Sequence, residues 1–168
     1  MANKTTFTPE EWAILRDTPQ LAAMAVTVSG ASGLFGTIQE AFGTTSALVD
    51  GMQSDNELIR ALCAKDEVVA AQQTLKGQAK AVQGGDLEAL KAKLQASATE
   101  NIGKAIALLS RKGDTADLTA YRTFVRGLAD KVANAAKEGS FLGFGGERVS
   151  GNERQMIAQI ETALGARA

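Results

Sequence analysis

Apolar residues recur every three or four positions along most of the chain, which is the period of a helix with one buried face. The first helix start lies in the segment FTPEEW, residues 7–12. Thr8 is placed to cap this helix, and Glu11 completes a capping box three residues later. Phe7 is placed to pack on Trp12 across the cap. These residues predict a helix that begins directly after the threonine.

Pro19 is predicted to interrupt the apolar run that follows. The residue before a proline is pushed away from helical geometry, so the first helix is expected to end by Asp17. A second helix is expected over residues 20–29, where apolar positions again recur at spacings of three and four. Glycines between residues 30 and 36 are expected to end it. Residues 34–52 hold too many glycine and hydroxyl side chains to predict one continuous helix.

Two serine–glutamate pairs mark further helix starts. Ser54 and Glu57 form a capping-box pattern that predicts a long helix, ending near Gly84. Ser150 and Glu153 form the same pattern and predict a helix at the C-terminal end of the chain.

The most regular pattern lies in the middle of the chain. Apolar residues step by three or four over residues 87–109, after a cap at Asp86, and Gly113 offers a left-handed exit. Asp114 and Asp117 then open a matching helix that is expected to end at Gly139. A connection this short predicts that the two helices lie antiparallel, as an αα-hairpin.

These helices account for almost the whole chain, and its 168 residues suit one domain. We find no alternating strand pattern, internal repeat or linker composition in the sequence. The sequence therefore predicts an all-α fold over residues 1–168, a single compact bundle of about seven helices that includes a long antiparallel αα-hairpin.

Histidine is absent from the composition, which restricts the possible chemistry. Ser/His/Asp triads, Cys/His dyads and di-iron sites built on Glu-x-x-His are all excluded. Carboxylates, lysines, Tyr121 and the single Cys63 remain for acid-base or nucleophilic work. No catalytic constellation and no cofactor site is readable from the sequence, so an enzyme is the least favoured class.

The distribution of charge along the chain limits which partners and which cellular location are expected. The 18 basic and 19 acidic residues are interspersed, so we expect no nucleic-acid partner. Acidic residues near the start do not fit a secretion signal, and a cytoplasmic location is expected. Residues 18–39 carry no charge, but glycine and hydroxyl residues dilute their second half, so membrane insertion is not expected.

The loop over residues 139–149 is the leading candidate site. It contains Phe141, Leu142, Phe144 and Arg148 among four glycines. One interpretation is that the apolar side chains fold back and plug the end of the bundle. The other is that they form an exposed contact for a protein partner or a second copy of the chain. A phosphate cradle is the weakest interpretation, because the pattern lacks Gly-Lys-Ser/Thr and includes acidic residues.

Other chemically interesting residues have simpler interpretations. Cys63 is expected to be a small core side chain, and Tyr121 is expected at the edge of the core with its hydroxyl outward. Arg122, Arg126 and Asp130 share a spacing of four that is typical of a solvated helix face. Paired acidic residues near helix starts are explained by capping, whereas a metal site made of carboxylates from separate helices is not readable from sequence.

The segment from Phe141 to Gly165 resembles the C-terminal signature of uncharacterised small helical bacterial proteins. It is also similar to the tellurite-resistance TerB-like helical domains, through Val149, Ser150 and Glu153. The acidic turn that would imply metal binding in those domains is replaced here by glycines.

Two functional hypotheses follow from these patterns. The first is a non-catalytic bacterial helical protein that binds a protein partner, or itself, through Phe141, Leu142, Phe144 and Arg148. The alternative, implied by the TerB-like resemblance, is a stress-response protein that binds a metal ion or small ligand.

Overall fold

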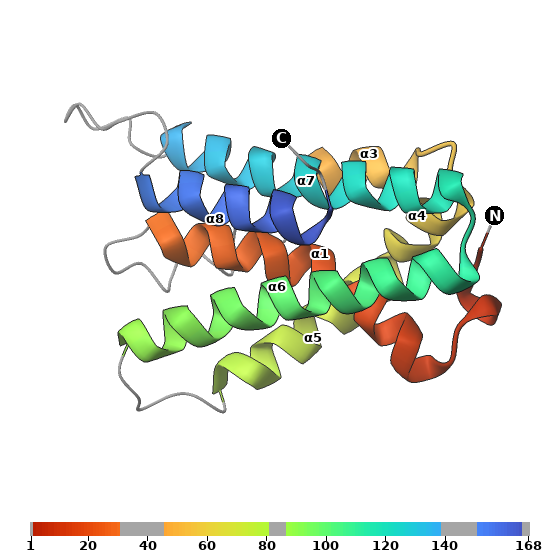
Figure 1. Cartoon of the computed structure of the whole chain (residues 1–168), viewed down its shortest axis with the longest axis horizontal. Helices are drawn as coiled ribbons and strands as arrows, with labels where there is room; N and C mark the ends of the chain where they lie inside the picture. Colours follow the sequence, from red (N-terminus) through yellow and green to blue (C-terminus); the bar gives the residue numbers. More distant parts are fainter. Residues whose placement is uncertain (1, 31–45, 81–86, 139–150, 166–168) are drawn as a thin grey trace.

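The computed structural model describes residues 2–30, 46–80, 87–138 and 151–165. Over these ranges the chain forms an all-α bundle, as the sequence predicts, with seven α-helices and one short 3₁₀ turn (Figure 1). The elements are η1 (Lys4–Thr6), α1 (Pro9–Gly30), α3 (Ser46–Met52), α4 (Glu57–Leu62), α5 (Lys65–Lys80), α6 (Leu87–Lys112), α7 (Thr115–Glu138) and α8 (Gly151–Ala163).

Helix α1 is the centre of the bundle. It packs against α5, α6, α7 and α8, and Figure 1 shows it running between them. From Thr18 to Ser29 every side chain except that of Thr27 is buried. A helix that is surrounded on all sides must be apolar around its whole circumference, which explains why this stretch carries no charge.

Helices α6 and α7 form the predicted antiparallel hairpin (Figure 1). Their connection at Gly113 and Asp114 begins where the amide of Gly113 donates to the carbonyl of Leu109, at 2.9 Å. The two helices lie close together near this connection and diverge toward the other end of the bundle, where α1 and α8 pack against both of them. Helices α6 and α7 therefore flank the core, and α1 lies within the core and packs against both of them.

The prediction that the first helix ends by Asp17 was wrong, because α1 continues through Pro19. In an α-helix the carbonyl of residue 15 would accept from the N–H of residue 19, which proline lacks. The hydroxyl of Tyr121, from α7, donates to the carbonyl of Leu15 instead, at 3.0 Å. A long-range hydrogen bond thus satisfies the carbonyl that the proline leaves unpaired.

The same contact corrects the expectation for Tyr121. Its side chain is fully buried and its hydroxyl points inward to α1, not outward to solvent. Burial raises the pKa of the phenol far above its usual range. The hydroxyl is therefore a permanent donor in the core.

The long helix predicted from Ser54 to Gly84 was also wrong in its first part, because the chain forms two helices there. Helix α4 ends at Leu62, with Cys63 as its C-cap, and α5 starts at Lys65. Asn56, and not Ser54, caps α4, through a hydrogen bond from the amide of Ile59 to its Oδ1 at 3.2 Å. The expected end near Gly84 lies outside the described residues.

The capping box at the start of α1 is confirmed. The amide of Thr8 donates to Glu11 at 2.9 Å, and the amide of Glu11 donates to the Thr8 hydroxyl at 3.3 Å. The rings of Phe7 and Trp12 lie 6.2 Å apart, and both side chains are buried. This staple fixes the angle at which the chain enters the bundle.

Asp117 joins three segments of the chain in one buried cluster that the sequence did not predict. Its side chain is fully buried and accepts hydrogen bonds from the amide of Ala2 at 2.6 Å and from Nδ2 of Asn56 at 3.0 Å. It also completes a capping box with Asp114, whose Oδ1 accepts from the Asp117 amide at 2.8 Å. The beginning of the described chain, the start of α4 and the start of α7 are held together at this point.

Candidate functional site

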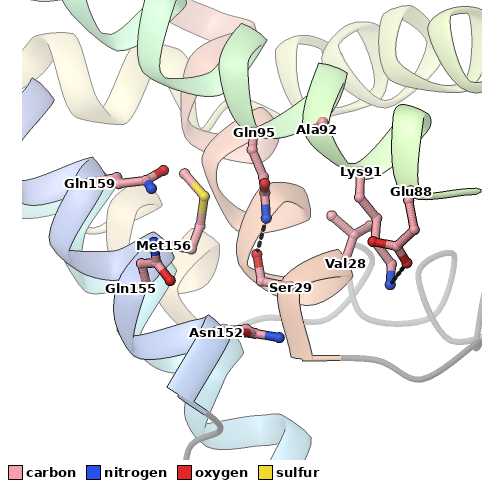
Figure 2. Close-up of a pocket in the computed structure, with 10 residues that line it drawn as sticks. All are labelled: Val28, Ser29, Glu88, Lys91, Ala92, Gln95, Asn152, Gln155, Met156 and Gln159. Carbon is pink, nitrogen blue, oxygen red and sulfur yellow. Dashed lines mark hydrogen bonds and ion pairs between the residues drawn. The ribbon is translucent and has the colours of Figure 1, made fainter.

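A polar cleft lies at the end of the bundle where α1 ends and where α6 and α8 begin (Figure 2). Its volume is about 260 Å³, and we call it the end cleft. Side chains of α8 line one side and side chains of α6 line the other, with Ser29 at the end of α1 between them. Three helices that are far apart in the sequence therefore contribute to one site.

The α8 side of the end cleft is a row of carboxamides. Asn152, Gln155 and Gln159 recur at spacings of three and four, which places them on one face of the helix, and all three side chains are exposed. Among the described residues, no side-chain hydrogen bond engages these three amides. Met156 lies beside them and is buried, so it forms an apolar floor.

The α6 side of the end cleft is close to electrically neutral. Lys91 forms an ion pair with Glu88 one turn earlier, with 2.8 Å between Nζ and Oε1. Gln95 donates through Nε2 to the hydroxyl of Ser29 at 2.8 Å, and that hydroxyl donates to the carbonyl of Ala25 at 2.7 Å. This chain of hydrogen bonds fixes the wall where α6 meets α1.

A glycine at the end of α1 lets the first turn of α8 approach closely. A Cβ atom at Gly30 would overlap the side chain of Glu153, which is itself buried in the first turn of α8. A larger residue at this position would therefore force the Glu153 side chain to shift.

The residues that the sequence singled out as a contact lie outside the described residues. These are Phe141, Leu142, Phe144 and Arg148, in the loop over residues 139–149. Both the plug and the exposed contact stay predictions. The described chain resumes at Gly151, the first residue of α8, and Asn152 already lines the end cleft.

Cys63 is a core residue, as predicted. Its side chain is fully buried, and burial raises the pKa of its thiol to about 12. A Cβ atom at Gly51 would overlap its sulfur, so α3 and α4 approach each other closely at this point. A buried thiol that stays protonated near neutral pH is a poor nucleophile.

We therefore expect Cys63 to resist a disulfide thiol reagent in the folded protein at pH 8. This pH is well below the raised pKa of the thiol, so almost no thiolate forms. The side chain is also buried, so the reagent cannot reach it. Absorbance of the released reagent should show no reaction until guanidinium chloride unfolds the chain, and then one thiol per chain. Rapid reaction of the folded protein would contradict this placement.

The predicted arginine row is solvated only in part. Arg126 is exposed and pairs with Glu161 of α8 at 2.8 Å and with Asp130 at 3.8 Å. Arg122 is half-buried, and its Nε has no hydrogen-bond partner among the described residues. This face of α7 is therefore partly covered by α8.

Several acidic residues near helix starts are engaged by cations or caps. Glu11 forms an ion pair with Lys112 at 2.5 Å, and the buried Glu67 pairs with Lys4 and Arg16. Within the described ranges, no three His, Cys, Asp or Glu side chains come together as metal ligands. The metal-binding alternative gains no observation from these ranges and stays a prediction.

The fold and the end cleft define the class of this protein, an all-α bundle with a polar cleft between three helices at one end. No family model matches the chain, and searches of curated proteins and of solved structures give no significant match. Of the helices in the described ranges, none combines the length and the apolar character that crossing a membrane requires.

Proposed function

We propose that this chain is a non-catalytic, cytoplasmic binding module of bacterial type. It associates with a protein partner, or with a second copy of itself, through the end of the bundle that carries the end cleft and the loop over residues 139–149.

The end cleft is the observation that carries this proposal. It combines three carboxamides that are not engaged by other described side chains with a buried methionine floor, and this mixture of polar and apolar groups is common at binding sites. The loop that carries Phe141 and Phe144 joins the chain immediately before α8, which lines the cleft.

The burial of the two most reactive side chains favours a binding function over a catalytic one. Cys63 and Tyr121 are both fully buried, and burial raises the pKa of each. Neither side chain lines the end cleft. A nucleophile or a general acid has to reach its substrate, so these residues serve the core.

Replacing both Phe141 and Phe144 with serine is expected to weaken association at least about tenfold, because buried aromatic anchors dominate most interfaces. Sedimentation velocity measures self-association, and pull-down from cell extract measures association with a partner. The matched control is Val49→Ser, which removes an exposed apolar side chain on α3, away from the end cleft.

Circular dichroism and thermal unfolding report whether the double variant folds. Unchanged association by a folded double variant would reject the proposal. Loss of folding would show that the two phenylalanines are plugs and not contacts.

A further inference from the structure

We propose that the end cleft binds an uncharged, extended peptide segment by pairing the peptide groups of that segment with the carboxamides of Asn152, Gln155 and Gln159. This inference rests on the proposed function, since it names the chemistry of the partner at the same site.

The chemistry of the carboxamide supports a peptide ligand. Each Asn or Gln side chain offers one carbonyl acceptor and two N–H donors, and a peptide group offers one acceptor and one donor in a similar plane. In an extended chain the N–H and the C=O of one residue point to the same side, so a carboxamide can accept from that N–H and donate to that C=O. The three carboxamides on α8 are exposed and are not hydrogen-bonded to other described side chains, so they are available to a ligand.

The spacing of the row also fits an extended chain. Side chains one helical turn apart are separated by about 5.4 Å along the helix axis. In an extended peptide, groups on the same side recur every second residue, about 6.6 Å apart. Flexible glutamine side chains bridge this small difference, so successive carboxamides along α8 meet every second residue of a bound segment.

The electrostatics of the cleft favour an uncharged segment. Lys91 is paired with Glu88, and Gln95 is held against Ser29, so the described residues of the α6 wall offer no unpaired charge. A charged ligand side chain would lose hydration in the cleft without gaining an ion pair.

The walls of the cleft favour a peptide over a sugar. No aromatic side chain is among the described residues that line it, and these residues offer a sugar ring or a nucleobase no stacking surface. Met156 supplies a soft apolar floor, against which small aliphatic side chains of a peptide can pack.

The test is a titration of the full chain, labelled with ¹⁵N, with a capped hexapeptide of alternating alanine and glycine. We expect saturable shifts of the side-chain amide signals of Asn152, Gln155 and Gln159, with a dissociation constant that the titration measures. The double variant Gln155→Leu/Gln159→Leu should bind roughly thirtyfold more weakly, because two lost hydrogen bonds are worth about 1 kcal/mol each.

Gln73→Leu is the matched control, because Gln73 is an exposed glutamine on α5 that does not line the cleft. It should bind the hexapeptide as the wild type does. Glucose, and a hexapeptide in which glutamate replaces alanine, should give weaker shifts or none.

The inference is overturned if the neutral hexapeptide gives no saturable shifts, if glucose binds more tightly, or if the Gln155→Leu/Gln159→Leu variant binds unchanged. Such a result is distinct from failure of the proposed function. That function would still stand if the Phe141→Ser/Phe144→Ser variant lost its association while the hexapeptide did not bind.

Discussion

Replacing Asp117 with alanine is expected to lower the free energy of unfolding by about 3–5 kcal/mol, the range for breaking a buried polar cluster. The fully buried carboxylate accepts from the amide of Ala2 and from Nδ2 of Asn56. Alanine leaves both donors buried without an acceptor, and it also removes one half of the capping box at the start of α7. Urea unfolding followed by circular dichroism measures the loss.

Asp114→Ala is the matched control for that measurement. Asp114 is exposed and caps the same helix, through the hydrogen bond from the Asp117 amide. Its loss should cost about 1 kcal/mol, the usual value for a helix cap. If both variants lost the same free energy, the buried cluster around Asp117 would contribute nothing beyond a cap.

Replacing Tyr121 with phenylalanine is expected to cost about 1–3 kcal/mol, the penalty for leaving a buried polar group unpaired. The ring stays in place, and only the hydroxyl that donates to the carbonyl of Leu15 is lost. The helix cannot repair this loss, because Pro19 has no N–H to donate to that carbonyl.

Pro19→Ala provides the matched test of this explanation. Alanine restores an N–H one turn after Leu15, so Tyr121→Phe should cost about 1 kcal/mol less in the Pro19→Ala background than in the wild type. The double-mutant cycle, measured by urea unfolding, isolates this coupling from the packing lost with the proline ring. Additive costs would mean that Tyr121 does not compensate for Pro19.

The helix starts that depend on neighbouring residues could be predicted from the sequence. The capping box of Thr8 with Glu11, and that of Asp114 with Asp117, both form as expected. These signals are local, because the donor and the acceptor lie within one turn of each other. The hairpin of α6 and α7 follows in the same way, from a connection too short for any other arrangement.

Features that depend on distant partners could not be predicted. Pro19 carries the signal of a helix end, and the hydroxyl that pairs with the freed carbonyl of Leu15 belongs to Tyr121, about a hundred positions later in the chain. Asn56 replaces Ser54 as the cap of α4, and its Nδ2 also donates to Asp117. No local pattern contains such contacts, so propensity and spacing alone gave the wrong boundaries.

The end cleft was missed for a related reason. Asn152, Gln155 and Gln159 are regularly spaced in the sequence, but a polar row on a helix is ordinarily a solvated face. The row lines a cleft because the end of α1 and the start of α6 lie opposite it. These three segments come together only in the folded bundle. The one feature of the sequence that could have indicated the cleft is that all three residues of this row are carboxamides and none is charged.

Photo-cross-linking tests most directly whether the chain acts by binding at the end of the bundle that carries the end cleft. A photoreactive phenylalanine is placed at Ala92, an exposed residue that lines the cleft, or at Ala116, an exposed residue of α7 near the opposite end of the bundle. In extract from the source cells, we expect a discrete adduct from position 92 only, reduced by excess wild-type chain. Equal adducts from both positions, or none from position 92, would contradict binding at this end.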